Sequence, residues 1–138
     1  MSAFARAVAA LIGIVVGAAA FLPWVADVSA WNLHLRSLFS VGEGDAATTW
    51  TSLGTAVAVS GLLILLGAVF NARMLVIVGA LLAVAIPAIW IFGNAVSHAE
   101  GAIPIARVQI GAFATAAGGF MALILAAVAR DASTPSLR

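Results

Sequence analysis

The chain has 138 residues, of which 64% are hydrophobic and 8% are charged, and its formal net charge is +1. Soluble domains usually have about a quarter of their residues charged, so this composition argues against a soluble globule and indicates one integral membrane domain. The small net charge argues against a nucleic-acid partner, and the lack of cysteine excludes disulfides, thiol nucleophiles and cysteine-ligated metals.

Four apolar segments are long enough to cross a bilayer, which takes about 20 residues in a helix. They span residues 7–24, 50–70, 74–93 and 108–129, and none of them contains Asp, Glu, Lys, Arg or His. The first segment also has features of a signal peptide, but we interpret it as a retained anchor. We therefore expect an all-α, four-helix transmembrane bundle over residues 1–130, followed by a short tail over residues 131–138.

The arginines predict how this bundle is oriented. Cytoplasmic flanks of membrane helices collect Arg and Lys. If both termini are cytoplasmic, four arginines lie on the cytoplasmic side: Arg6, Arg73, Arg130 and Arg138. The other two, Arg36 and Arg107, then lie on the outer side. The sequence predicts a multi-pass plasma-membrane protein with both termini inside. There is no lysine, so no polybasic patch for anionic lipids is evident in the sequence.

The first outer loop contains a segment unlike the rest of the chain. From Trp31 to Arg36 apolar and polar residues alternate, which predicts a short extracytoplasmic strand or hairpin lying over the bundle. An interfacial helix over residues 31–39 is the alternative, since Trp31, Leu35 and Leu38 also share one helical face. We interpret Trp24, Trp31 and Trp50 as interfacial positioning residues.

The carboxylates and histidines of the outer loops are poor candidates for metal ligands, because their number and spacing do not match a known metal site. Glu43 and Asp45 are two residues apart, but a calcium loop needs more oxygen ligands, so we expect a turn that precedes the second crossing. His34 and His98 lack a third ligand at a recognisable spacing for zinc. We predict no metal site and no cofactor.

Small residues at helical spacing predict close helix packing. In the first crossing Gly13 and Gly17 are four residues apart, and in the fourth Gly111, Thr115 and Gly119 form one stripe. We expect some of these small-residue faces to contact a partner. In the third crossing Pro87 predicts a kink, because proline cannot donate the helical hydrogen bond and its ring crowds the preceding turn.

The crossings have no residue typical of membrane catalysis or ion transport. Ionisable groups inside membrane helices mark proton relays and substrate paths, and the four crossings have none. Ser60 and Thr115 have no base in register that could activate them. We therefore predict a non-enzymatic protein.

The arrangement of motifs resembles that of small four-helix membrane proteins of actinobacteria. The resemblance rests on Leu22-Pro23-Trp24-Val25 at the end of the first segment, on Gly42-Glu43-Gly44-Asp45 in a polar outer loop, and on three further helices. Among such proteins the chain is similar to the accessory subunits of Mce-type lipid importers. That resemblance implies a position beside a permease and a part in moving lipid across the envelope.

We therefore expect an accessory subunit of a larger plasma-membrane complex, most plausibly a lipid transport system with permease-type subunits. The alternatives are an accessory subunit of a respiratory complex, or a self-associating membrane protein with a lipid-binding cleft. The predicted partner-contact residues are the small residues of the helices and four residues of the outer loop: Gly13, Gly17, Gly111, Thr115, Gly119, Trp31, Asn32, His34 and Arg36.

Overall fold

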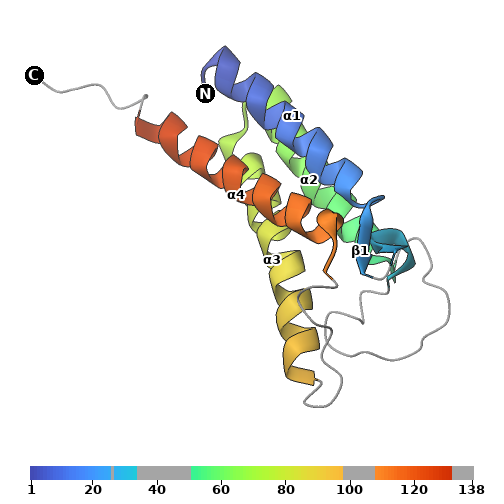
Figure 1. The fold of residues 1–138 in the computed structure, drawn as a ribbon. Helices are drawn as coiled ribbons and strands as arrows, with labels where there is room; N and C mark the ends of the chain where they lie inside the picture. Colours follow the sequence, from blue (N-terminus) through green and yellow to red (C-terminus); the bar gives the residue numbers. More distant parts are fainter. Residues whose placement is uncertain (26, 34–50, 98–107, 132–138) are drawn as a thin grey trace, which may run out of the picture.

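A computed structural model of the chain describes residues 1–25, 27–33, 51–97 and 108–131, and it is mostly helical (Figure 1). Its helices are α1 (Ala3–Ala19), α2 (Leu53–Val69), α3 (Arg73–Ser97) and α4 (Ile110–Asp131). A two-stranded antiparallel sheet pairs β1 (Pro23–Val25) with β2 (Val28–Ser29), and the 3₁₀ turn η1 (Ala30–Asn32) follows directly. The four predicted helical segments are therefore confirmed as helices.

The ends of the helices follow from local chemistry. The Ser2 side chain accepts from the Ala5 amide at the start of α1, and Ser52 caps α2 in the same way through the Gly54 amide. The first segment was predicted as helical to residue 24, but α1 ends at Ala19. Pro23 explains this difference, because the residue before a proline is pushed out of the helical region.

Two of these helices pass a length-and-hydropathy test for membrane spans. They are the segments Arg73–Gly93 of α3 and Ile110–Ala129 of α4, whereas α1 and α2 have 17 residues each. A span of 17 residues is at the lower limit of the usual range. Helix α3 continues through Pro87 without ending, so the proline does not terminate the helix, and the predicted kink at this residue stays a prediction.

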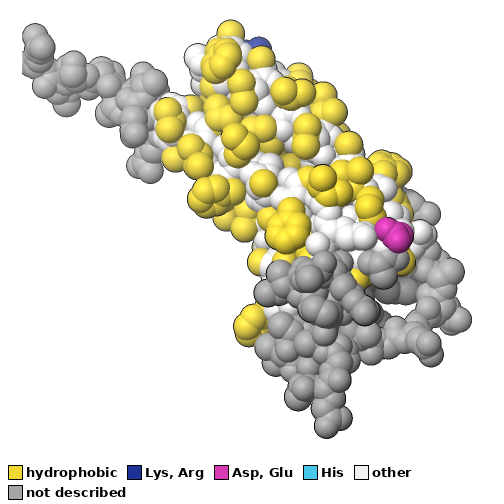
Figure 2. Space-filling model, viewed as in Figure 1, with side chains coloured by type: hydrophobic (Ala, Val, Ile, Leu, Met, Phe, Trp, Pro, Cys, Tyr) yellow, Lys and Arg dark blue, Asp and Glu magenta, His cyan; other side chains and the backbone are white. Residues whose placement is uncertain are grey.

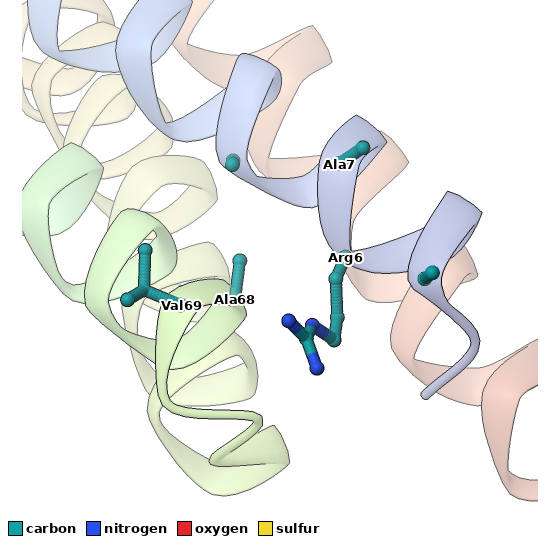
Figure 3. A pocket seen from close by; sticks show the side chains of 6 residues that line it. Arg6, Ala7, Ala68 and Val69 are labelled. Atoms are coloured by element: carbon teal, nitrogen blue, oxygen red, sulfur yellow. The ribbon is translucent and has the colours of Figure 1, made fainter.

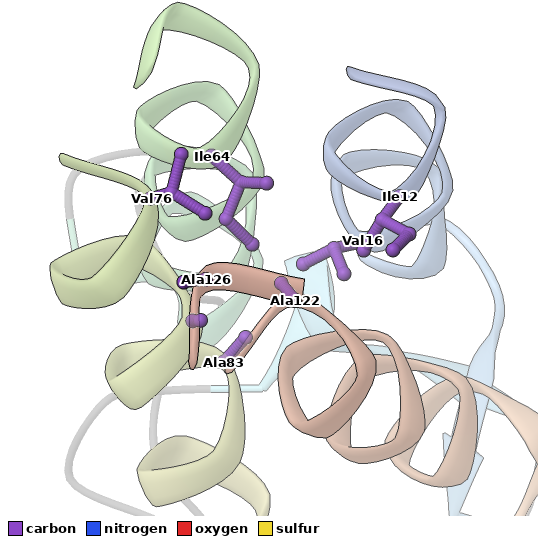
Figure 4. Packing of buried hydrophobic residues seen from close by; sticks show 8 residues of the cluster. Ile12, Val16, Ile64, Val76, Ala83, Ala122 and Ala126 are labelled. Atoms are coloured by element: carbon purple, nitrogen blue, oxygen red, sulfur yellow. The ribbon is translucent and has the colours of Figure 1, made fainter. Parts of the chain in front are cut away.

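The helices form an antiparallel bundle with small side chains at its centre. In one cluster Ile12 and Val16 of α1 pack with Ile64 of α2 and Val76 of α3, and alanines of α3 and α4 fill the space between them (Figure 4). These alanines are Ala80, Ala83, Ala122 and Ala126. Since half of the residues of this cluster are alanines, the four helices approach one another closely.

Glycines are at the points where the helix backbones meet. A Cβ added at Gly61 of α2 would lie 2.5 Å from the amide nitrogen of Gly17, and one at Gly13 would lie 2.7 Å from the amide nitrogen of Leu65. In the same way Gly79 of α3 faces the Ser60 carbonyl of α2 at 2.7 Å. Real Cβ atoms are not found at such distances, so only glycine permits these approaches.

The predicted hairpin exists, but its strands are formed by other residues than those predicted. The outer segment does contain a hairpin, but its strands are Pro23–Val25 and Val28–Ser29. The residues Ala30–Asn32 form a 3₁₀ turn instead of starting a strand at Trp31. Asp27 has a φ of 64° and forms the tight turn of the hairpin, which Asp tolerates better than most residues. Residues 34–36 of the predicted strand lie outside the described residues.

We predict that Gly61→Ala destabilises the bundle and that Gly17→Ala does not. The new methyl group at position 61 collides with the backbone of α1, and overpacking of this kind costs about 1–3 kcal/mol. A methyl group at position 17 has no atom within 4 Å. The measurement is the free energy of unfolding of each purified variant in detergent. Equal losses in both variants would contradict this packing.

Candidate partner-contact site

A small folded unit covers one end of the bundle, and we call it the hairpin cap: residues 23–25 and 27–33. It includes two of the predicted partner-contact residues, Trp31 and Asn32. Figure 1 places β1 beside the start of α2 and near the start of α4. The cap can present side chains to a neighbouring protein in a defined position only if it is held firmly on the helices.

Trp24 anchors the cap in the core. Its side chain is fully buried, its Nε1 donates to the Ala19 carbonyl at 3.0 Å, and the Trp90 ring meets it edge-on at 6.0 Å between centroids. Gly111 makes room for the indole at the start of α4. The prediction that Trp24 is an interfacial residue was therefore wrong. It was misplaced because the sequence does not show that the chain turns back at Pro23.

Ser52 fastens the cap to α2. Its hydroxyl lies 2.8 Å from the Trp31 carbonyl and 3.1 Å from the Ala30 carbonyl, and it accepts from the Gly54 amide at 3.0 Å. The amide of the next residue, Leu53, donates to the Leu33 carbonyl at 2.8 Å. One buried hydroxyl thus caps α2 and fixes η1 on top of it. Sequence analysis did not single out this serine.

Gln109 fastens the other side of the cap to α4. Its backbone amide donates to the Trp24 carbonyl at 2.8 Å, and its side chain accepts from the Asp27 amide at 3.1 Å. The Gln109 Nε2 also donates to the Asp27 carboxylate at 3.2 Å. A bridge between Val25 and Val108 lies beside these bonds. The hairpin turn is therefore held by both the backbone and the side chain of the residue before α4.

Within the cap, Asn32 is exposed and Trp31 is partly buried. The Trp31 ring lies 5.3 Å from the Phe21 ring, and a Cβ at Gly54 would touch it at 2.8 Å. The Asn32 side chain makes one long contact of 3.5 Å with the Ser29 hydroxyl. Asn32 and the exposed Asp27 therefore give the described part of the cap its outward polar groups. His34 and Arg36 lie outside the described residues.

The small residues of the predicted partner surface mostly face the chain itself. Gly13 faces α2, Gly111 faces Trp24, and Gly119 faces the Ala80 carbonyl of α3 at 2.8 Å. Thr115 is buried, and its hydroxyl donates to the Gly111 carbonyl at 2.8 Å. These four residues are used inside the bundle, which corrects their assignment to a partner surface. Gly17 differs, since its Cβ direction is open.

The described interior holds hydroxyls as its polar side chains. Ser52, Ser60 and Thr115 are buried, and each donates to a backbone carbonyl at 2.7 to 3.1 Å. Within the described residues, no group of three or more His, Cys, Asp or Glu side chains is placed to hold a metal ion. Glu43, Asp45 and His98 lie outside this part of the chain. The described interior therefore offers packing surfaces and satisfied hydroxyls.

Comparison of the chain with protein-family models, with curated proteins and with solved structures gives no match. The hairpin cap and the helix surfaces are therefore the features of this chain from which a function can be inferred.

We predict that Ser52→Ala loosens the hairpin cap, whereas Ser29→Ala leaves it intact. The first change removes the helix cap and the shared bond to two carbonyls, at a cost of about 1–3 kcal/mol for a buried group. The second removes only the 3.5 Å contact with Asn32. Hydrogen–deuterium exchange in detergent should show faster exchange at Leu33 and Leu53 in Ser52→Ala alone. Unchanged exchange there would mean that this serine does not hold the cap.

Proposed function

We propose that this protein is a four-crossing membrane subunit that acts by contact, as an accessory component of a larger plasma-membrane complex. The observation that supports this proposal most strongly is the distribution of large apolar side chains. Many of them lie on the outside of all four helices, whereas alanine is the commonest residue of the buried core, which also holds Trp24, Trp90 and a few branched aliphatic side chains.

The exposed apolar side chains are large and numerous. The exposed fractions are 78% for Phe4, 71% for Phe70, 72% for Met74 and 71% for Phe92. On α4 the exposed residues Phe113, Phe120, Met121, Ile124 and Val128 continue the pattern over the length of the helix. Figure 2 shows apolar side chains spread over the visible face of the helices. Soluble monomers rarely expose large contiguous apolar surfaces. Contact with lipid hydrocarbon or with a membrane partner would cover the apolar surface of this protein.

The ends of the bundle support the predicted orientation. The Met1 amino group donates to the Asn71 side chain at 3.1 Å, so the start of α1 and the turn between α2 and α3 lie at the same end. Arg6 and Arg73 are part of this end, while the hairpin cap with Asp27 is at the other end (Figure 1). Arginine collects on the cytoplasmic side, so we assign this end to the cytoplasm and the cap to the outside.

The distribution of polar groups between the interior and the hairpin cap supports a role through contact with another protein. The three buried hydroxyls are bonded to backbone carbonyls, and the buried side-chain nitrogens without a partner among the described residues are Trp31 Nε1, in the hairpin cap, and Arg73 Nε, at the other end of the bundle. The hairpin cap is rigidly held and presents Asp27 and Asn32, and the sequence continues with His34 and Arg36. We propose that the cap sets where the subunit docks and that exposed helix faces supply most of the contact area. The partner class that we propose is a permease-type subunit of an Mce-type lipid transport system.

Labelling of single cysteines tests the orientation, because the native chain has no cysteine. We expect Glu43→Cys to react with an impermeant maleimide in intact cells and Ala72→Cys to react only after the membrane is permeabilised. Unmodified chain is the background control. The reverse pattern would overturn the assignment of both termini to the cytoplasm.

Affinity purification in a mild detergent, followed by mass spectrometry, tests the subunit role. The wild-type chain should bring down permease-type subunits at a fixed ratio. Replacement of Asn32, His34 and Arg36 together by Ser should leave membrane insertion intact and reduce this recovery. The loss of several hydrogen bonds at about 0.5–1.5 kcal/mol each lowers affinity at least several-fold.

Arg138→Ser in the tail is the matched control, since it removes one positive charge away from the cap. Full recovery of the triple variant under dilute conditions would show that the cap is not the docking element. If the purification recovers further copies of this chain and no other protein, the chain self-associates and the accessory role is wrong.

A further inference from the structure

A groove lies between the first turns of α1 and the last turn of α2, at the end that we assign to the cytoplasm. Its volume is about 220 Å³, and it is lined by one charged residue and five small apolar ones: Arg6, Ala3, Ala7, Ala10, Ala68 and Val69. In Figure 3 the Arg6 side chain extends from α1 toward α2, beside Ala68 and Val69. The groove therefore combines a cationic rim with an apolar floor.

The Arg6 guanidinium has no charge partner among the described side chains. The residue is exposed, and in the part of the chain that the structure describes no hydrogen bond or ion pair involves its side chain. Arg73 begins α3 at the same end, and its Nε is buried without a hydrogen-bond partner among the described residues. Asp27 belongs to the hairpin cap, which is at the opposite end of the bundle (Figure 1). Within the described part of the chain, the groove thus holds a positive charge that no carboxylate neutralises.

The apolar floor of the groove continues along the seam between α1 and α2. Ala3, Ala7 and Ala10 share one helical face, and the next position on it is Ile14, which is 56% exposed. On α2, Leu62 is seven residues before Val69 and is 51% exposed. An extended hydrocarbon chain that leaves the groove would therefore meet apolar side chains from both helices.

We propose that this groove binds the anionic headgroup of a membrane phospholipid, with the phosphate on the Arg6 guanidinium and one acyl chain along the α1–α2 seam. A volume of about 220 Å³ is below the 300–1,000 Å³ usual for a whole small ligand, so only the headgroup region fits inside. Arginine pairs with phosphate through two parallel hydrogen bonds. Basic pockets between helices on the cytoplasmic side are a known mode of binding anionic lipids.

This inference rests on the proposed membrane embedding of α1 and α2, but not on the proposed partner complex. Sequence analysis offered a lipid-binding cleft as an alternative but assigned no residues to it, and the chain has no lysine cluster that would have indicated one. The fold creates one by setting Arg6 against residues 68 and 69 of another helix.

Native mass spectrometry of the purified full chain, in a neutral detergent, tests the proposal. The probes are dioleoylphosphatidylglycerol and dioleoylphosphatidylcholine, added separately at equal concentration. We expect wild type to bind the anionic lipid in preference. Arg6→Gln should weaken that binding about tenfold, the order expected for one lost charge-assisted hydrogen bond, and Arg6→Lys should keep part of it.

Two further variants separate the groove from general charge. Arg107→Gln removes one positive charge from the segment between α3 and α4, and it should keep the lipid preference. Ala10→Leu fills the groove but leaves Arg6 in place, and it should lose binding to the same degree as Arg6→Gln. Equal binding of both lipids by wild type, or an unchanged preference in Arg6→Gln, would overturn the proposal. Competition by inorganic phosphate at the same concentration would also overturn it, since the site would then bind free anions.

Carbonate extraction of the same membranes separates this proposal from the one on which it rests. Chain that stays in the pellet but shows no preference for anionic lipid contradicts the groove alone. Chain that is released into the supernatant contradicts the membrane embedding as well.

Discussion

Direct contact between the backbones of α1 and α2 is the constraint on which the rest of the structure depends. Gly13 and Gly61 let the two helices touch, and a methyl group at either position would overlap the neighbouring backbone. This contact brings the start of α2 under the hairpin, where Ser52 can bond to the carbonyls of η1. At the other end it sets Arg6 beside Ala68, which forms the groove.

The same constraint explains why the surface is apolar. Close helix approach requires small residues at the interfaces, so Gly and Ala occupy much of the inside of the bundle and many of the large apolar side chains point outward. In water this arrangement would leave hydrocarbon exposed at a cost of about 25 cal/mol per Å². In a bilayer that cost disappears, and helix association depends on packing and hydrogen bonds. The division into small inside and large outside is thus the one expected for a membrane bundle.

The sequence predicted the helices well because their signals are local. Long apolar runs are contained within each segment, and all four segments formed helices with ends shifted by a few positions. The hairpin cap was harder, because it depends on contacts between distant residues. Gln109 bonds to Asp27 across 82 positions, and Ser52 bonds to Ala30 across 22. No pattern near Gln109 or Ser52 indicates these partners.

The small-residue stripes show a second limit of sequence patterns. Gly17 and Gly119 look alike in the sequence, but Gly119 faces the Ala80 carbonyl and the Cβ direction of Gly17 is open. Which face of a helix meets its neighbour is set by the packing of all four helices, so spacing cannot distinguish an internal contact from a free surface. For the same reason the groove at Arg6 could not be predicted from the sequence.

Spin labelling in lipid bilayers tests the central claim most directly, namely that the exposed apolar faces of all four helices lie in hydrocarbon. The cysteine-free chain allows single labels at Ile14, Leu62, Leu81 and Phe120, one exposed position on each helix, with exposed Asn32 in the cap as the aqueous reference. We expect the four helix labels to collide readily with oxygen and rarely with a water-soluble nickel complex, and the label at Asn32 to show the opposite preference. Helix labels that are as accessible to nickel as the label at Asn32 would contradict a bundle embedded in the membrane.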